Sequence, residues 1–327
     1  MLTLHCHSGE FCAHASGTLA ETVAAAAAQG FRVLGLSEHV PRTADADLYP
    51  EERAASLTVD DLARRFDAYV AAARRHQHAL PSGDASAAAP PAMLILVGCE
   101  TELIRPSDLA LARALAERHR LDYLVGSVHH VYGVPIDFDA AGLDQAEACA
   151  EQRRRTLAAS AGRSDVDDLS DAAADATEQL FMDYFDAQQT MLETLRPTVV
   201  AHFDLIRLFR PAAPLTPRVW RRVRRNAAWI AAHDMLVEIN SRALKKGLAD
   251  PYPMGDVARV LRDAGCRFTL ADDSHGADQI GLGYDAAWAY VRRLGLTRLW
   301  YPLPRRDGGS DPAVLPRCPS RIPAHRV

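Results

Sequence analysis

Short apolar runs alternate with longer amphipathic stretches along most of this chain. The runs at 31–37, 93–98 and 268–271 have the length and composition of buried strands. Residues 59–79 instead repeat apolar side chains at helical spacing. Strands that alternate with helices are typical of an α/β fold built on a parallel sheet or barrel.

The same patterns place the other elements. We predict strands at 1–7, 31–37, 93–98, 123–127, 199–201, 236–239, 268–271 and 299–301. We predict helices at 19–29, 59–79, 107–118, 180–195, 219–233, 254–264 and 286–295. Thr18 followed by Glu21 is a capping-box pattern that begins the first helix. Residues 40–57 and 240–253 are predicted to be loops.

Composition indicates a globular protein rather than a membrane or nucleic-acid-binding one. The chain has 327 residues, of which 48% are hydrophobic and 24% charged, enough for one large domain or two ordinary ones. Its net charge of −5 argues against general nucleic-acid binding. No apolar run approaches the roughly 20 residues of a membrane span, and no signal peptide is visible. The 6 cysteines form no C-x-x-C pair, so we expect reduced thiols and a cytoplasmic location.

Potential metal ligands follow six of the predicted strands. His5 and His7 alternate with apolar Leu4 and Cys6, so both imidazoles would leave one face of a strand. A single histidine at a strand end is more often structural, but the carboxyl ends of parallel barrel strands meet at one mouth. The candidate ligands are His5, His7, His14, His39, Glu100, His129, His202, Asp273 and His275.

This set of imidazoles and carboxylates exceeds what one ion can use, because zinc usually takes four ligands. We therefore expect two to three divalent ions, with Glu100 as the natural bridge between two of them. A mixed nitrogen and oxygen set suits zinc, manganese or iron better than magnesium or calcium. Neighbouring ions activate water and neutralise an anionic substrate, which favours a phosphoesterase acting on a small phosphate ester.

Basic residues near the same strand ends are candidates for binding the phosphate. Arg207 lies shortly after His202, and Arg242 and Lys245 follow the strand predicted at 236–239. Arginine grips phosphate oxygens with two parallel hydrogen bonds, and lysine supplies a compact charge. Each could instead be a solvated surface charge, and its position at the mouth is what favours a role in binding.

The ordered motifs resemble those of the PHP (polymerase and histidinol phosphatase) superfamily. The run His5-Cys-His7-Ser-Gly-Glu-Phe-Cys-Ala-His14 is similar to its first motif. Later motifs match in order at Gly35-Leu-Ser-Glu-His39, Gly98-Cys-Glu100, Gly126-Ser-Val-His129, Val200-Ala-His202 and Asp273-Ser-His275. The stretches His202-Phe-Asp-Leu-Ile-Arg207 and Glu238-Ile-Asn-Ser resemble the histidinol-phosphatase branch, especially its fungal-type members.

The resemblance implies a distorted (β/α)7 TIM-like barrel with a trinuclear metal site. It implies one domain over 1–301, surface insertions at 81–92 and 163–175, and a tail at 302–327. By analogy, His5, His7, Glu100 and Asp273 would hold one ion; Glu100, His129 and His202 a second; His14, His39 and His275 a third. The residues closest to the chemistry would be His5, His7, Glu100, His129, Asp273 and His275. An arginine is usual in the family where Lys245 stands, and His130 is expected to point away if the chain there is extended.

From this resemblance we expect hydrolysis of L-histidinol phosphate by in-line attack of a metal-activated hydroxide. Arg207 and Lys245 would help the metals to stabilise the phosphoryl oxygens. Two alternatives stay open. One is a phosphoesterase of the same superfamily that acts on another small ester or a nucleotide. The other is a metal-binding protein without catalysis.

Overall fold

Seven parallel strands form the centre of the molecule. The computed structural model describes residues 1–79, 93–160, 175–304 and 320–323. The sheet has the order β1-β3-β4-β5-β8-β9-β10, and every neighbouring pair in it is parallel. Its strands are β1 (Leu2–Thr3), β3 (Val33–Leu36), β4 (Leu94–Glu100), β5 (Tyr123–Gly126), β8 (Val199–Val200), β9 (Leu236–Asn240) and β10 (Arg267–Ala271). The predicted α/β barrel is confirmed.

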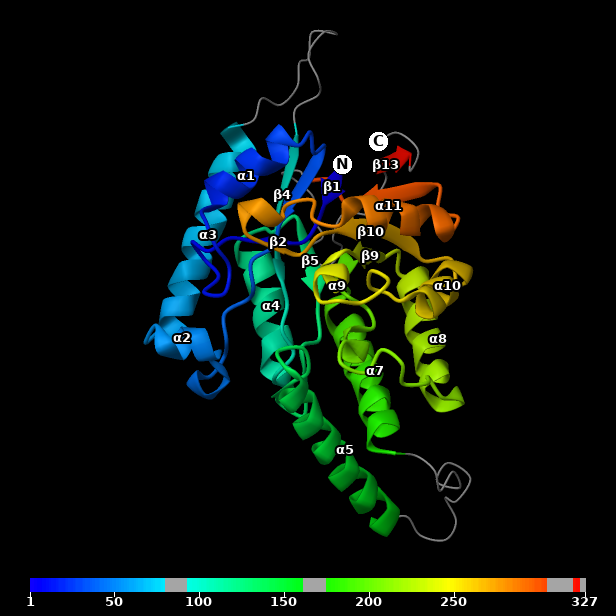
Figure 1. The fold of residues 1–327 in the computed structure, drawn as a ribbon. Coiled ribbons are helices and arrows are strands. Elements are labelled where there is room, and N and C mark those ends of the chain that lie inside the picture. Colours follow the sequence, from blue (N-terminus) through cyan, green and yellow to red (C-terminus); the bar gives the residue numbers. More distant parts are fainter. Residues whose placement is uncertain (80–92, 161–174, 305–319, 324–327) are drawn as a thin grey trace.

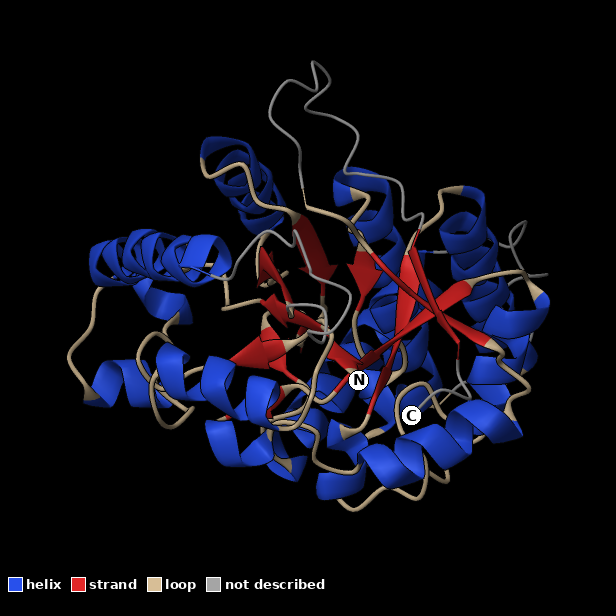
Figure 2. Ribbon diagram, turned by 90° about the horizontal axis from the view of Figure 1, so that it is seen from above, coloured by secondary structure: helices blue, strands red, loops and turns tan. Residues whose placement is uncertain are grey.

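Helices surround this sheet, as the view from above shows (Figure 2). They are α1 (Leu19–Ala28), α2 (Pro50–Ala54), α3 (Val59–Ala79), α4 (Pro106–Arg118), α5 (Ala140–Ser160), α7 (Ala176–Leu195), α8 (Pro217–Ala232), α9 (Arg242–Lys245), α10 (Gly255–Asp263) and α11 (Tyr284–Arg293). Short 3-10 turns lie at η1 (Asp45–Asp47), η2 (Leu205–Arg207) and η3 (Ala277–Gln279). The capping box of Thr18 and Glu21 begins α1 as predicted. Among the described residues, no helix is long and apolar enough to cross a membrane.

The two edges of the sheet meet beside the N-terminus (Figure 1). The Thr3 hydroxyl, at the end of β1, donates to Asp272 Oδ1 at 3.0 Å, just after β10. Beyond this contact, β2 (Cys6–His7) and β11 (Ser274–His275) form a short parallel pair that sets His7 opposite His275. The nearly closed barrel therefore brings the first and last predicted ligand motifs side by side.

The Tyr123 side chain lies inside the barrel, where the absence of a side chain at two glycines leaves room for it. Tyr123 is fully buried, and its hydroxyl lies 2.9 Å from the carbonyl oxygen of Leu4 and 3.2 Å from that of Leu36. A Cβ at Gly35 would overlap the Tyr123 hydroxyl, and a Cβ at Gly98 would overlap its ring. These glycines are required by close packing, since dense interiors do not absorb an added methyl group.

Some segments differ from the expectation. The predicted loop 40–57 contains η1 and α2, because Pro50 occupies the first helical position and Glu52 accepts from the backbone N–H of Tyr49 at 2.7 Å. The predicted loop 240–253 contains α9. Part of the predicted tail forms β13 (Ser320–Pro323), which pairs antiparallel with β12 (Arg298–Tyr301). A small hairpin joins β6 (His130–Val131) to β7 (Val134–Pro135). The expected insertion at 81–92 and nearly all of that at 163–175 lie outside the described residues.

Candidate metal centre

A cavity of about 370 Å³ opens at the carboxyl ends of the barrel strands. Its wall includes side chains from many predicted ligand positions, namely His14, His39, Glu100, His129, His202, Asp273 and His275. His5 and His7 lie deeper and are almost completely buried. Sequence-distant histidines and carboxylates thus converge because parallel strands end at the same edge of the barrel.

Glu100, the last residue of β4, lies at the centre of the cluster. Its Oε1 is 3.2 Å from the Nε2 atoms of His5, His129 and His202. Its Oε2 lies 2.9 Å from His39 Nδ1 and 3.4 Å from His7 Nε2. The Ser127 hydroxyl donates to Oε1 at 2.7 Å and orients the carboxylate. One carboxylate facing five imidazoles has the geometry of a bridging ligand.

Several buried ring nitrogens in this cluster have no hydrogen-bond partner. They are Nε2 of His5, both ring nitrogens of His7, both of His39, and Nδ1 of His202. Several of them lie close to a Glu100 or Glu38 oxygen without the geometry of a hydrogen bond. Buried polar atoms are nearly always satisfied, so such a concentration requires an explanation. A set of unsatisfied imidazole nitrogens around a buried carboxylate fits divalent metal ions, which accept lone pairs from both.

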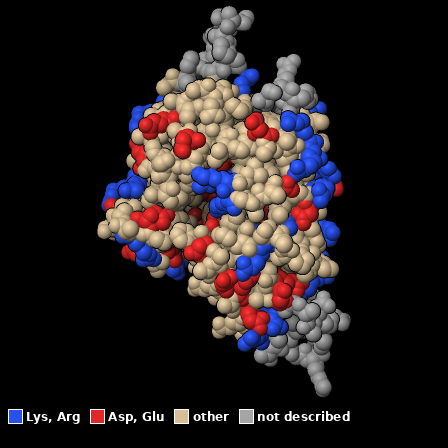
Figure 3. Space-filling view, viewed as in Figure 1, with Lys and Arg blue, Asp and Glu red and all other residues tan. Residues whose placement is uncertain are grey.

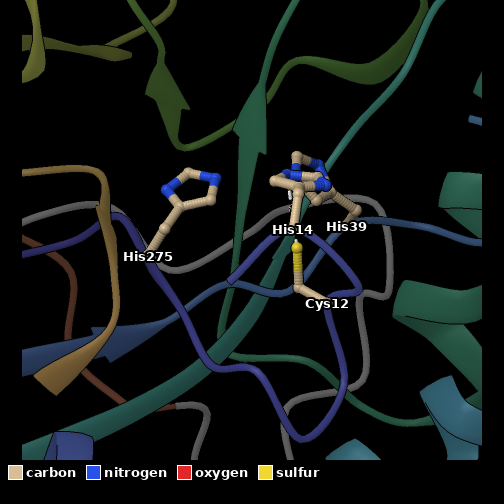
Figure 4. A group of neighbouring side chains, drawn as sticks. All are labelled: Cys12, His14, His39 and His275. Carbon is tan, nitrogen blue, oxygen red and sulfur yellow. Dashed lines mark hydrogen bonds between the residues drawn. The ribbon is translucent and has the colours of Figure 1, made fainter. Parts of the chain in front are cut away.

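The ligand atoms fall into overlapping groups in which all atoms lie within 4.8 Å of one another. His5 and His7 group with Glu100, and His129 and His202 also group with Glu100. His7 groups with Asp273 and His275. Cys12 belongs to two groups, one with His7 and Glu38 and one with His14, His39 and His275 (Figure 4). The structure therefore brings together all nine predicted ligands, and it adds a cysteine that the sequence analysis treated only as a reduced thiol.

Carboxylates outside the cluster orient its imidazoles. Glu238 Oε2 lies 3.1 Å from His5 Nδ1, and Glu102 Oε2 lies 3.1 Å from His129 Nδ1. Glu51 Oε1 lies 2.8 Å from His14 Nδ1, and Glu38 Oε2 lies 3.5 Å from His7 Nδ1. A carboxylate at one ring nitrogen fixes the tautomer and leaves the other nitrogen free for a metal. The sequence analysis did not assign these four residues, although Glu238 in an otherwise apolar strand was a detectable signal.

Electrostatics keep the carboxylates ionised. Burial raises the pKa of Glu100, but His5, His129 and His39 outweigh it and hold that pKa well below its usual value. The same balance with His5 and His275 lowers the pKa of Asp273. These carboxylates are therefore available as anionic ligands near neutral pH.

The pKa values of the histidines are raised for some residues and lowered for others. Burial disfavours charge on His7, yet its contacts with Glu100 and Glu38 raise its pKa to about 9. Nearby carboxylates likewise raise the pKa values of His5 and His129 against the effect of burial. Burial and the charge of His7 lower the pKa of His39 to about 3. Without metal, the cluster thus holds protons on some imidazoles and excludes them from others.

Two candidate ligands have strained backbones. His202 has φ 21° and Asp273 has φ 49°, in the left-handed region that non-glycine residues rarely adopt. Such conformations cost of order 1–3 kcal/mol and concentrate at functional sites. Each residue lies two positions after the end of a barrel strand, β8 or β10, where the chain turns at the mouth of the barrel.

Of the three basic residues predicted at the mouth, one lines the cavity. Arg242 and Lys246 line the cavity, whereas Arg207 and Lys245 do not. Arg207 is buried, and its Nη1 lies 2.7 Å from Asp256 Oδ1 and 3.5 Å from Asp204. These carboxylates hold the guanidinium away from the cavity wall. Figure 3 shows basic side chains gathered beside a hollow near the middle of the visible face. Phosphate binding by Arg207 and Lys245 stays a prediction, and the cavity adds Lys246.

The outer part of the cavity combines aromatic and acidic side chains. His130 lines it and stacks on Tyr49 with ring centroids 6.1 Å apart, so it does not point away as expected. The reason is that β5 ends at Gly126 and β6 begins at His130, so strand alternation does not apply between them. Asp137 and exposed Phe138 complete this side, and Asp137 Oδ2 lies 3.3 Å from Lys246 Nζ.

A parallel barrel with buried histidines and carboxylates at its strand ends is the architecture of a metal-dependent α/β-barrel protein. The chain belongs to the PHP family, because the model of the PHP domain matches residues 3–242. This family assignment agrees with the motif resemblance and covers the strands that supply most of the cluster.

Two fungal proteins are similar over most of their length. A probable histidinol-phosphatase of Schizosaccharomyces pombe is 37% identical over 303 residues, covering 91% of this chain and 88% of the relative. The histidinol-phosphatase of Saccharomyces cerevisiae is 28% identical over 314 residues, covering 88% of this chain and 87% of the relative.

Solved structures share the fold. A putative histidinol phosphatase HisK from Listeria monocytogenes has a TM-score of 0.65 at 20% identity and covers 88% of this chain and 99% of that one. Histidinol phosphate phosphatase HisK from Lactococcus lactis has a TM-score of 0.59 at 14% identity, covering 92% and 96%. The latter structure is a complex with zinc, L-histidinol and phosphate.

Proposed function

We propose that this chain is a metal-dependent histidinol-phosphatase, which hydrolyses L-histidinol phosphate to L-histidinol and phosphate in histidine biosynthesis. The observation that carries the proposal is the buried cluster of histidines around Glu100, with its unsatisfied ring nitrogens. The fungal relatives, which match most of the chain, are named for this activity. Together they support both the reaction type and the substrate.

For the metal centre we propose two to three divalent ions, of zinc, manganese or iron. His5, His7, Glu100 and Asp273 would hold one ion; Glu100, His129 and His202 a second; His14, His39 and His275 a third. The groups of ligand atoms support the second and third sets directly, and the first set combines the group of His5, His7 and Glu100 with Asp273, whose Oδ1 lies 3.6 Å from His5 Nε2 and 3.7 Å from His7 Nε2. The zinc in the Lactococcus lactis structure is consistent with it.

Bound divalent ions would lower the pKa of a coordinated water and neutralise charge on the phosphate. The chain's own residues prepare this chemistry. Glu238, Glu102 and Glu51 hold His5, His129 and His14 in single orientations. Arg242 and Lys246 place positive charge at the cavity wall, where they would bind the phosphoryl oxygens.

The organic part of the substrate would lie toward Asp137. L-Histidinol phosphate carries an ammonium group and an imidazole beside its phosphate. Although burial raises the pKa of Asp137, Lys246 and His129 outweigh it, so this carboxylate is ionised. Asp137 could pair with the ammonium group, and Phe138 and the stacked rings of Tyr49 and His130 offer surface for the imidazole.

The proposal is tested by removing single ligands. His129→Ala and Asp273→Ala should each lose nearly all release of phosphate from L-histidinol phosphate while keeping the circular dichroism of a folded α/β protein. His78→Ala, on the exposed end of α3, is the matched control and should retain full activity. Near wild-type turnover in either ligand variant would remove that residue from the centre.

A further inference from the structure

We propose that Cys12 is a sulfur ligand of the third metal position, beside His14, His39 and His275. The four ligand atoms lie within 4.8 Å of one another, which is the spacing of donors around one ion. Figure 4 shows the Cys12 side chain directed at the ring of His14, with His39 beside it and His275 approaching from the other side. This inference rests on the metal-centre part of the proposed function and not on the substrate.

The hydrogen bonds around His14 prepare it and Cys12 to bind together. Glu51 Oε1 accepts from His14 Nδ1 at 2.8 Å, so the neutral ring carries its lone pair on Nε2. That Nε2 lies 3.3 Å from Cys12 Sγ. In the absence of metal the thiol can donate to this lone pair. The sulfur and the nitrogen therefore already share the space that an ion would enter.

His39 supplies an independent sign of a missing partner. It is partly buried, its Nδ1 lies 2.9 Å from Glu100 Oε2, and its buried Nε2 has no hydrogen-bond partner. Its ring centroid lies 5.2 Å from that of His14. His14, His39 and His275 together line the main cavity. An ion bound there would satisfy His39 and would have the buried sulfur as a neighbour.

The loop that carries Cys12 is anchored to the barrel. The backbone N–H and hydroxyl of Ser8 both donate to Glu38 Oε1, at 2.8 and 2.7 Å, and Cys12 N–H donates to Ser8 O at 2.9 Å. Ser16 N–H donates to the carbonyl oxygen of His275 at 3.0 Å. A Cβ at Gly9 would overlap the backbone at Ser16, so the loop packs tightly on itself. These contacts fix the position of Cys12 relative to His275.

Coordination requires one proton to leave. The S–H bond of Cys12 breaks, the sulfur lone pair forms a bond to the divalent ion, and the proton passes to solvent. A thiolate is a soft ligand, so this position should favour zinc or cobalt over manganese. Replacement of sulfur by oxygen should reverse that preference at this position alone.

The test uses the full chain, freed of metal with a chelator and titrated with Co²⁺. Thiolate bound to Co²⁺ gives a charge-transfer band in the near ultraviolet, whereas imidazole and carboxylate ligands do not. We expect the band in the wild type, its loss in Cys12→Ser, and its retention in the control Cys149→Ser, whose partly buried cysteine lies away from the cluster. Cys12→Ser should also retain about one zinc ion fewer after dialysis.

The outcomes separate this inference from the proposed function. Bound cobalt without a charge-transfer band in the wild type, or a band that survives in Cys12→Ser, would overturn the role of Cys12 and leave the metal centre standing. Absence of any bound metal would overturn the centre itself. If Cys12→Ser and Cys12→Ala do not fold, the zinc-loaded wild type decides the matter. Its crystal structure should place Sγ about 2.3 Å from an ion, and a distance beyond bonding range would contradict the proposal.

Discussion

Glu102 contacts His129 on the side of the ring that faces away from Glu100. Its Oε2 lies 3.1 Å from His129 Nδ1, while Nε2 of the same ring lies 3.2 Å from Glu100. We predict that Glu102→Gln weakens metal binding by roughly 10- to 100-fold, because a neutral amide lacks the negative charge that raises the basicity of the ring. Equilibrium dialysis against zinc measures the change.

The matched control for this variant is Glu147→Gln, which alters a carboxylate that pairs with Arg210 far from the cluster. It should bind zinc as tightly as the wild type. Equal affinity for Glu102→Gln and the wild type would show that the carboxylate is structural and does not tune the metal ligand.

Metal binding should depend on pH because some ligands begin protonated. The pKa of His7 is raised to about 9, and those of His5 and His129 are also raised. Below that range these rings carry a proton that an ion must displace, so affinity should increase as the pH rises from about 6 to 9. Calorimetric titration at pH 7 in two buffers of different ionisation enthalpy should reveal proton release. A heat that is independent of the buffer would contradict this prediction.

Asp137 should distinguish histidinol phosphate from simpler esters. Asp137→Asn removes the charge proposed to pair with the substrate ammonium and leaves Lys246 without its partner at 3.3 Å. We predict a higher KM for L-histidinol phosphate with little change in KM for p-nitrophenyl phosphate, which has no ammonium group. Steady-state kinetics on both esters give the comparison. A parallel rise in both KM values would mean that Asp137 acts on the phosphate site instead.

Single residues also show what the sequence could and could not reveal. The predicted strand over 1–7 is divided into β1 and β2 with His5 between them, yet His5 and His7 both face Glu100 as expected. The positions of His129 and His202 after strands correctly placed them at the same mouth. Glu102 was not found, because an orienting carboxylate differs from a surface one only by its contacts. Cys12 was assigned as an ordinary thiol, since only the folded loop shows which ring lies beside it.

Among the elements, the packing of β3 and β4 around Tyr123 allows a sharp test. Gly35→Ala should cost about 1–3 kcal/mol of stability, because its methyl group would overlap the Tyr123 hydroxyl. Tyr123→Phe removes that hydroxyl and should rescue Gly35→Ala in part. Urea unfolding of the single and double variants measures the coupling.

Gly98→Ala is the control, because its methyl group would meet the Tyr123 ring and backbone, which Tyr123→Phe leaves in place. It should be destabilised with and without the tyrosine change. Rescue of both alanine variants, or of neither, would contradict the proposed packing.

Long helices and strands were easier to predict from the sequence than short helices. The long amphipathic α3 and the apolar β10 follow from periodicity and lie within a few residues of their predicted ends. The short α9 was predicted to be a loop, since few of its residues pack and its start depends on Asn240 Oδ1 accepting from Arg242 N–H at 2.8 Å. That error matters, because the turn of α9 decides that Lys246 and not Lys245 lines the cavity.

At the scale of the whole molecule, the barrel explains why motifs far apart in the sequence contribute to one site. β2 and β11 pair where the sheet edges meet, so the first and last ligand motifs become neighbours. The alternation of strands and helices predicted this class of fold. It did not predict how the edges close, because that depends on a contact between Thr3 and Asp272, almost the full length of the chain apart.

We propose that the whole barrel serves one reaction, the hydrolysis of L-histidinol phosphate at the cluster around Glu100. Its most direct test is phosphate release from L-histidinol phosphate, p-nitrophenyl phosphate and a nucleoside monophosphate, with metal content measured on the same sample. We predict a strong preference for L-histidinol phosphate and about two to three divalent ions per chain. Bound metal with equal turnover of all three esters would contradict the substrate, and bound metal with no turnover would leave a metal-binding protein without catalysis.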